Sequence, residues 1–527
     1  MASKKQFKNF LSKQFGTSPG DYFYYNAENR LDKVSRYNKV VNEFYPGTND
    51  VDDVTWNDLE MDRLFCRINH TNSFIGEQLL YHKLHVLKLD EEDNKLITSL
   101  DGKNEFINEM EFCLNGAGKR DESYHLVDFL FNSNLWIIGK SYIYHILQLI
   151  LLICIIFTAV FRNAYAIAGL ITIALVNIVI YYITKSKYEI YIDSLSDFKR
   201  IYDCAEQIRH YDKEKLVVND KLVKSLDSLK GISRFIVGSN NRKYGILQGD
   251  PFAILSDYLF GICLYDISMF NYNMKSISKK FDDVLYVVGF IGKLDAAIAV
   301  LSYRASIAKW CEPRYVNGDA AEISATALYH PLIKDAVPND FVLRDRAVIT
   351  GANASGKSTF MKSLAINCIL AQTINTCSAS EFSMKPVTVI TCMALRDDVI
   401  SGESYYLREA KYIKRMLDII SKNEDVLIVI DEILKGTNTK ERIAASKAIM
   451  HYVSEYNCFA VVATHDNILA ENEKYSPYYF SSKVSDEEFF FDYKINKGIC
   501  DKSNAIDLLA FLGYPEIIVK EARENIN

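Results

Sequence analysis

A chain of 527 residues is longer than one hydrophobic core supports, so two or more domains are expected. Its 49% hydrophobic and 24% charged residues exclude a disordered protein, and its net charge of −6 excludes a globally basic surface for nucleic acid. None of the eleven cysteines forms a C-x-x-C pair, which argues against a zinc site or a disulfide framework and favours reduced thiols in a cytosol.

The amino-terminal stretches carry little specific chemistry. Residues 1–50 hold no strong motif, and their first sixteen residues lack the apolar core of a signal peptide. Residues 51–115 place apolar side chains at helical intervals, and Gly76 within them indicates close helix packing or a bend. We therefore expect an N-terminal segment of uncertain structure over 1–50 and the first part of a helical core over 51–140.

Two long apolar runs follow, from Ile143 to Phe161 and from Ala164 to Ile183. The first is interrupted only by His145 and Gln148, and the second by Asn177. Each run is long enough to cross a hydrocarbon core, and tyrosines cluster near the ends. A buried hairpin in a large soluble core is the alternative, but helices that are apolar on every face are unusual there. The pattern predicts a transmembrane helical hairpin within residues 141–186.

The charges around the hairpin predict its orientation. Its flanks carry Lys140, Lys185 and Lys187, whereas the short link carries only Arg162. Positive charge concentrates on the cytoplasmic side of membrane helices. We expect localisation to the inner or cell membrane, with both flanks and the remaining chain in the cytoplasm.

Residues 187–310 return to a helical pattern and predict the second part of the core, ending in a lever-like helix over 281–310. Within this part, residues 251–270 are apolar enough to suggest a third span. Asp257 and Asp266 argue against a span, because acids are costly in mid-membrane, so we interpret the stretch as a packed core helix.

Residues 315–500 alternate strands with helices, as an α/β sheet does, and we expect an α/β domain over 311–527. It contains the sequence VITGANASGKST from Val348 to Thr359. This stretch fits the phosphate-binding loop G-x-x-x-x-G-K-[ST], with a strand over 347–350 and a helix over 358–374. Its lysine would contact the β- and γ-phosphates of ATP, and its serine would ligate Mg²⁺. The predicted ATP-binding residues are Gly351, Asn353, Ala354, Ser355, Gly356, Lys357, Ser358 and Thr359.

Two later strands of the same domain end in candidate catalytic side chains. The apolar run 426–430 delivers Asp431 and Glu432, and the run 461–464 delivers His465. A carboxylate beside the phosphate loop suits Mg²⁺, so Asp431 joins Ser358 as a predicted metal ligand. Glu432 would orient or deprotonate the attacking water, and His465 would sense the γ-phosphate. Lys357, Glu432 and His465 are the predicted catalytic residues.

A serine-bearing loop between these elements is a second candidate anion site. Residues 398–404 (DVISGES) precede a helix from Tyr405 to Ser421. In ATPases of the ABC superclass, a loop at this place reaches the γ-phosphate bound by a partner subunit. Ser404 is therefore a candidate nucleotide contact in a composite dimer site, and a simple helix cap is the alternative.

These residues together resemble the MutS family of mismatch-repair ATPases. The resemblance covers about residues 51–115 and 280–527 and rests on the following segments: LYHPLIKDAVPNDFVL (328–343), the phosphate loop, SYYLREA (404–410), DEILKGTNTKERIAAS (431–446), ATHDNILAE (463–471) and residues 493–526. Several positions depart from the family pattern, notably Ala352–Ser355, where the family usually has Pro-Asn-Met-Gly, and Tyr405–Leu407.

The resemblance implies an α/β P-loop NTPase domain of the ABC/MutS type on an all-α core and lever domain. It also implies Mg²⁺-dependent ATP hydrolysis and a homodimer, with residues 493–526 as a helical dimerisation element. No Phe-x-Glu wedge occurs in residues 1–50, so we expect a membrane-associated variant without the mismatch-reading domain.

The function expected from sequence is thus a membrane-anchored, MutS-like ATPase dimer, with lipid bound through 143–183. DNA is an open partner, and mismatch repair is the role that the family suggests. An ABC-type transporter ATPase is one alternative, although a single hairpin offers scarcely any polar residue to line a path. A membrane-tethered DNA clamp is the other, and the short basic pairs Arg242-Lys243 and Lys279-Lys280 give it little support.

Overall fold

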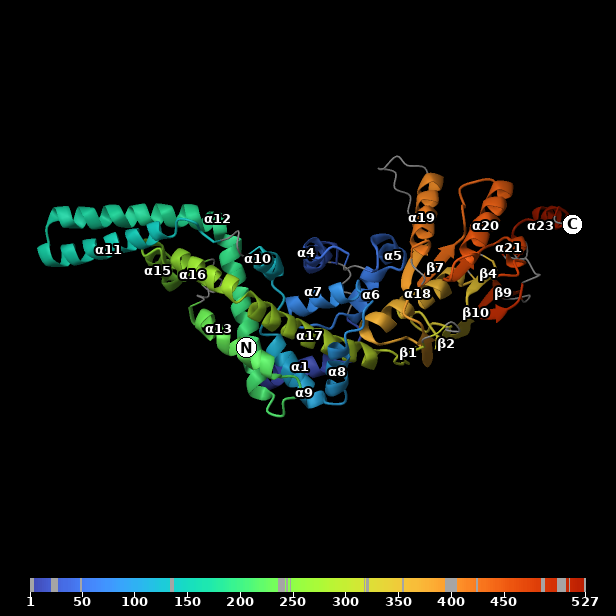
Figure 1. Cartoon of the computed structure of the whole chain (residues 1–527), viewed down its shortest axis with the longest axis horizontal. Coiled ribbons are helices and arrows are strands. Elements are labelled where there is room, and N and C mark those ends of the chain that lie inside the picture. The colour runs from blue at the N-terminus through green and yellow to red at the C-terminus, as the bar shows by residue number, and fades with distance from the viewer. Residues whose placement is uncertain are drawn as a thin grey trace. The chain divides into compact units, whose positions relative to one another are not determined.

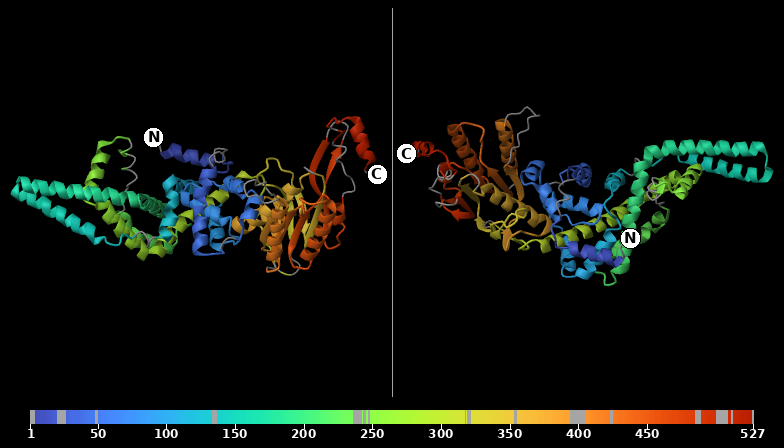
Figure 2. Two further views of the ribbon diagram at one scale, coloured as in Figure 1. Left: turned by 90° about the horizontal axis from the view of Figure 1, so that it is seen from above. Right: turned by 180° about the vertical axis from the view of Figure 1, so that it is seen from behind.

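The computed structural model divides into two compact units (Figures 1 and 2). The first comprises residues 1–46, 69–82 and 95–302, and the second comprises 47–68, 83–94 and 303–527. The structure describes residues 4–19, 27–47, 50–132, 137–235, 242, 245–246, 248–316, 318, 322–352, 355–393, 405–422, 425–484, 489–499, 509–510 and 512–525. Residues 51–68 and 83–94, expected within the helical core, thus group with the α/β part of the chain.

The described part of the first unit is helical. Its helices are α1 (Lys4–Gln14), α3 (Ala27–Val34), α4 (Arg36–Phe44), α7 (Phe74–Lys83), α8 (Glu91–Leu100), α9 (Asn104–Leu114), η1 (Asp121–His125), α10 (Leu126–Phe131), α11 (Tyr142–Phe161), α12 (Ala164–Tyr211), α13 (Asp220–Phe235), α15 (Pro251–Ile262), α16 (Tyr265–Lys279) and α17 (Phe281–Ser306). The ends of α7, α8 and α17 lie at or across the boundaries of the two units.

A buried carboxylate fixes α7 against α17. Asp295 of α17 accepts hydrogen bonds from the backbone amides of Asn72 (2.9 Å) and Ser73 (2.7 Å) at the start of α7. A Cβ atom added at Gly76 would lie 2.2 Å from Asp295 Oδ2, so only glycine fits this helix contact. The close packing expected at Gly76 is confirmed. Burial raises the pKa of Asp295 to about 6.

The two apolar runs form a helical hairpin, drawn in teal in Figure 1. Its link is closed by Asn163, whose side chain accepts a hydrogen bond from Ala166 N (2.8 Å), and by Arg162 in the left-handed conformation. By length and composition, α11, residues 164–188 of α12, and α17 are each apolar enough to cross a membrane. Only 6% and 17% of the apolar windows of α11 and α12 are buried, against 72% for α17. Helix α17 is therefore a core helix, whereas crossing by the hairpin stays a prediction.

The expectation of one packed core helix over 251–270 is wrong. The helix is interrupted at Cys263 and Leu264, and the axes of the two resulting helices, α15 and α16, differ by 69°. Several apolar side chains of α15 are exposed, whereas Asp257 and Asp266 are buried. Both acids have partners in the fold, so they do not carry the cost of unpaired buried charges.

The second unit is built on two sheets. The larger has the order β10-β9-β4-β8-β7-β6, in which β9, β4, β8, β7 and β6 are parallel and β10 is antiparallel. Its strands are β4 (Arg346–Thr350), β6 (Thr388–Cys392), β7 (Val426–Asp431), β8 (Phe459–Ala463), β9 (Ser476–Val484) and β10 (Phe489–Lys497). The smaller sheet, in the order β1-β5-β2-β3, comprises β1 (Arg314–Tyr315), β2 (Ile323–Leu328), β3 (Asn339–Leu343) and β5 (Glu381–Met384).

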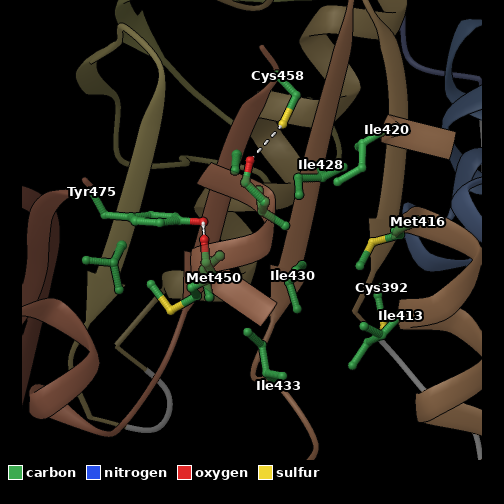
Figure 3. Packing of buried hydrophobic residues seen from close by; sticks show 14 of the residues in the cluster. Cys392, Ile413, Met416, Ile420, Ile428, Ile430, Ile433, Met450, Cys458 and Tyr475 are labelled. Carbon is green, nitrogen blue, oxygen red and sulfur yellow. Dashed lines mark hydrogen bonds between the residues drawn. The ribbon is translucent and has the colours of Figure 1, made fainter. Parts of the chain in front are cut away.

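Helices cover both faces of the larger sheet. Alternate residues of its strands, such as Ile428 and Ile430, pack with α19 (Tyr405–Ile420) and α20 (Thr439–Ser454) in the apolar cluster of Figure 3. The intervening residues turn to the opposite face, where α18 (Lys357–Ile374) lies against β6, β7 and β8. Helices α21 (Asn467–Ala470) and α23 (Glu516–Glu524) complete this unit, together with α5 (Asp53–Asp58) and α6 (Met61–Ile68). The expected α/β domain is confirmed.

Polar contacts explain why residues 47–68 belong to this unit. The buried Asp58 accepts hydrogen bonds from Thr391 Oγ1 (2.8 Å) and Met393 N (2.9 Å) at the end of β6. Glu60 accepts one from Lys362 Nζ of α18 (2.8 Å). This early segment therefore braces a strand and the helix that follow the nucleotide loop.

Candidate nucleotide-binding site

The phosphate loop connects β4 to α18, as its sequence predicted. Gly351 and Gly356 both have positive φ, at 139° and 105°. A Cβ at Gly351 would lie 2.6 Å from the carbonyl oxygen of Phe480, and one at Gly356 would lie 3.1 Å from the ring of Tyr493. These glycines are required by conformation and by space. The N-terminus of an eighteen-residue helix then faces the loop, which suits an anion.

The loop lysine lies over the loop itself. Lys357 Nζ donates hydrogen bonds to the carbonyl oxygens of Gly351 (2.7 Å) and Ala352 (2.9 Å). Burial lowers its pKa, although the neighbouring charge of Asp431 opposes that effect. The buried hydroxyl of Ser355 has no hydrogen-bond partner among the described residues. The loop thus holds the Lys357 ammonium and the Ser355 hydroxyl, which has no partner among the described residues, where a phosphate would bind.

The two predicted Mg²⁺ ligands, Ser358 and Asp431, are in direct contact. Ser358 Oγ, in the first turn of α18, donates a hydrogen bond to Asp431 Oδ2 at the end of β7 over 2.5 Å. Strand β8 lies between β4 and β7, so the carboxyl ends of these parallel strands bring the loop, Asp431 and the start of the β8 loop to one edge. Hydroxyl and carboxylate oxygens are hard ligands, which suit Mg²⁺. The residues present therefore fit this ion.

The two other predicted catalytic residues are also in contact. His465 Nε2 lies 2.5 Å from Glu432 Oε1, and Lys435 Nζ lies 3.6 Å from Glu432 Oε2. Burial acts to raise the pKa of Glu432, but the hydrogen bond with His465 and the charge of Lys435 outweigh it and hold the pKa below its ordinary value. Glu432 is thus kept ionised. Its φ of 63° is a left-handed conformation, held by the hydrogen bond from its amide to Ala463 O (3.1 Å).

Two further contacts, which sequence reasoning did not assign, position these groups. The buried Glu409 of α19 accepts a hydrogen bond from Lys435 N (3.0 Å) and so holds the turn after β7. Arg442 of α20 donates twice to Asp466, next to His465, over 3.1 and 3.0 Å. Glu409 had a signal, because it stands in the SYYLREA segment of the resemblance. Of the remaining predicted residues, Thr359 lies in the first turn of α18, whereas Asn353, Ala354 and Ser404 lie outside the described residues.

A cavity of about 370 Å³ lies next to the phosphate loop, and Gly356 and Thr359 form part of its wall. Its lining is mainly apolar and includes the aromatic rings of Tyr329, Phe480 and Tyr493. Burial lowers the pKa of His330, another lining residue, to about 4, so this side chain is neutral at neutral pH. The wall comes from residues 328–339, 356–363, 480 and 493. No local motif could reveal a cavity assembled from segments so far apart.

Comparison with known proteins agrees with this geometry. Residues 347–527 match the family model for MutS domain V. That match begins in β4 and includes the phosphate loop, Asp431, Glu432 and His465. This part of the chain is therefore similar to domain V of the MutS family.

Curated relatives extend the likeness to about half of this chain. It is 28% identical over 261 residues to the DNA mismatch repair protein MutS of Pseudothermotoga lettingae, an alignment that covers 47% of this chain and 32% of the relative. The MutS of Thermosipho melanesiensis is 27% identical over 50% of this chain and 33% of the relative, and that of Ruminiclostridium cellulolyticum is 30% identical over 47% and 30%. The chain thus spans about a third of the length of these curated relatives.

Proposed function

We propose that this chain binds and hydrolyses ATP with Mg²⁺, as a membrane-anchored dimer of the MutS family. The ATPase proposal rests on two contacts beside the phosphate loop, one between Ser358 and Asp431 and one between Glu432 and His465. These residues come from three adjoining strand ends and have the chemistry that phosphoryl transfer to water requires.

Each residue has a distinct task in this proposal. Lys357 exchanges its loop carbonyl partners for phosphate oxygens and stabilises their negative charge. Ser358 and Asp431 hold Mg²⁺, which neutralises charge on the phosphates when bound. Glu432, ionised at neutral pH, accepts a proton from the attacking water. His465 holds the Glu432 carboxylate in place, and its contact with the γ-phosphate stays part of the proposal.

The cavity beside Gly356 is the proposed nucleobase site. It adjoins the phosphate loop, its wall is mainly apolar, and the ring of Tyr493 lies against Gly356. Asn339 fixes Tyr493 by donating a hydrogen bond from Nδ2 to its carbonyl oxygen (3.0 Å). A flat aromatic base stacks favourably on such a ring.

The carboxy-terminal element supports a homodimer. Four large apolar side chains stand exposed on residues 512–518, namely Leu512, Tyr514, Ile517 and Ile518. Helix α23 has only one buried residue, Val519, so its apolar side chains have little cover within the chain. A second copy of the chain is the proposed partner. In that dimer, Ser404 of each copy would complete the site of the other.

The hairpin is the proposed membrane anchor. Only 6% and 17% of its two apolar windows are buried, which would be unfavourable in water over helices of 20 and 25 residues. The flanking lysines favour a cytoplasmic position for the proposed ATPase unit. Recovery in the membrane pellet after washing with high salt tests the anchor, and recovery in the soluble fraction would refute it.

The relatives' names make DNA a candidate ligand of the dimer. We propose it as a partner to be tested, because the relatives are named DNA mismatch repair proteins. Binding to duplex DNA should weaken steeply as salt rises if basic side chains contact phosphates. A flat response to salt would contradict such contacts.

The ATPase proposal is tested with Glu432→Gln. The amide keeps the shape but accepts no proton, so ATP turnover should fall by roughly 100-fold or more while ATP binding persists. The matched control is Glu441→Gln on α20, because Glu441 is exposed and lies outside the site. Unchanged turnover in Glu432→Gln would refute the assigned role.

A further inference from the structure

Helix α15 has two faces of opposite character. Ala253, Asp257 and Gly261, which recur every four residues, are buried. The other side exposes a continuous set of large apolar side chains, Phe252, Ile254, Leu255, Tyr258 and Leu259. The helix begins sharply, because Asp250 caps the amide of Phe252 (3.0 Å) and Pro251 occupies its first turn.

The buried face of α15 packs on the hairpin helix α12. Gly261 admits the ring of Tyr181, since a Cβ there would lie 2.9 Å from that ring. Asp257 accepts hydrogen bonds from Lys185 Nζ (2.8 Å) and from the hydroxyl of Tyr181 (3.2 Å). The same hydroxyl donates to Asp266 (3.1 Å), which also pairs with Arg242. Both acids that argued against a membrane location are therefore neutralised by partners.

Two amides of the hairpin satisfy the broken backbone between α15 and α16. Asn177 Nδ2 of α12 donates to Ile262 O (2.8 Å), and Gln148 Nε2 of α11 donates to Cys263 O (2.9 Å) and Ser268 Oγ (3.0 Å). These are two of the few polar residues that interrupt the apolar runs. In hydrocarbon, a helix end needs such partners because water is absent.

The contacts place the interruption between α15 and α16 beside the middle part of the hairpin helices. They place the start of α15 and the end of α16 near the residues that flank the hairpin. Gln148 lies six residues from Tyr142, where α11 begins, which at 1.5 Å per residue is about 9 Å. Asn177 lies eleven residues before Tyr188, where the apolar part of α12 ends, which is about 16 Å. From the break, α16 leads back along α11, because Lys275 Nζ reaches Ser141 Oγ (3.3 Å) at the start of that helix. With twelve residues, α15 is about 18 Å long, too short to cross a hydrocarbon core of about 30 Å.

We propose that α15 and α16 form a re-entrant element, and that the exposed face of α15 contacts the acyl chains of the cytoplasmic leaflet. This inference rests on the proposed membrane hairpin and extends it to a third lipid-facing helix. Acyl chains are the occupant because α15 packs on α12, whose apolar window is itself only 17% buried, so the exposed apolar face of α15 continues that of the hairpin. The hairpin then serves as a scaffold whose polar side chains hold a broken helix at membrane depth.

Lipid photo-crosslinking tests the proposal. Benzoylphenylalanine is incorporated singly at Leu259 of α15, at Leu152 of α11 and at Tyr452 of α20, whose side chains are 54%, 53% and 42% exposed. The full chain is reconstituted in vesicles of phosphatidylethanolamine and phosphatidylglycerol and illuminated. Mass spectrometry then detects the addition of one phospholipid.

We expect phospholipid adducts at Leu259 and Leu152 and none at Tyr452. Adducts at Leu152 without any at Leu259 overturn the re-entrant element and leave the hairpin anchor standing. A crosslink from Leu259 to a second copy of the chain also overturns it, because protein then covers this face. Adducts at neither Leu152 nor Leu259 refute the anchor and the re-entrant element together.

Discussion

Ser358 and Asp431, 73 residues apart in the sequence, are joined by a hydrogen bond of 2.5 Å from the serine hydroxyl to the carboxylate. This bond links the first turn of α18 to the end of β7, so the position of the phosphate loop and that of the proposed Mg²⁺ ligand Asp431 are set together.

The Ser358–Asp431 pair predicts how Mg²⁺ dependence changes when the carboxylate is removed. Asp431→Asn keeps the hydrogen-bond acceptor but removes the negative charge that binds the cation. We expect the Mg²⁺ concentration for half-maximal ATP turnover to rise about 10-fold or more, as measured by a Mg²⁺ titration of phosphate release. Asp418→Asn is the control, since Asp418 is exposed on α19 and pairs only with Lys414 in the described structure. An unchanged Mg²⁺ requirement in Asp431→Asn would remove this residue from the metal site.

The contact between His465 and Glu432 predicts a shift in the pH profile of turnover. The histidine lowers the pKa of Glu432, and the carboxylate acts as a base only above that pKa. His465→Ala should therefore raise the pKa and move the acid limb of kcat to higher pH. His451→Ala, at an exposed position of α20, should leave the limb in place. A lower kcat with an unmoved limb would show that His465 acts by another route, such as contact with phosphate.

Glu111 in α9 predicts a pH-dependent loss of stability. Burial, aided by the nearby Asp295, raises its pKa from 4.5 to about 8. The folded state therefore binds the Glu111 proton more tightly than the unfolded state, and the resulting stability, complete below about pH 4.5, is lost as the pH rises through 8. Glu111→Gln should remove this loss, so that the variant gains stability relative to the native chain between pH 5 and 9. Thermal unfolding in detergent over that range measures the difference, and parallel curves would contradict the assignment.

The hydrogen bonds of Asp58 predict that residues 47–68 stabilise the α/β unit. Asp58→Ala leaves the Thr391 hydroxyl and the Met393 amide without their acceptor. We expect the free energy of unfolding to fall by roughly 2–4 kcal/mol, because buried donors lose bonds to a charged group. Asp53→Ala, at an exposed position of the same helix, should change it much less. Chemical denaturation, followed by ATPase activity and helical content, provides the comparison.

The exposed face of the carboxy-terminal helix predicts a dimer sensitive to charge. Ile517 is 75% exposed, so Ile517→Asp places a charge on the surface without disturbing the fold of the chain. We expect a large shift toward monomer in sedimentation measurements. Lys520→Asp, which alters charge at another exposed position of the helix, is the control. A dimer that survives Ile517→Asp would place the interface elsewhere.

The sequence by itself determined the parts of the site that lie close together in the chain. The phosphate loop, its strand and its helix are local, because glycine spacing and the apolar period are properties of neighbouring residues. Asp431, Glu432 and His465 were also predictable, since each follows an apolar strand and parallel strands present their carboxyl ends at one edge. The two hairpin helices were recognisable from composition alone.

Only the tertiary structure decided what distant segments do together. It brought residues 47–68 to the second, α/β unit through buried hydrogen bonds that no periodicity encodes. It assembled the cavity beside Gly356 from four separate parts of the chain. It also supplied the partners of Asp257 and Asp266, which lie on α12 and at Arg242, and the cost of an acid in an apolar setting depends on such partners.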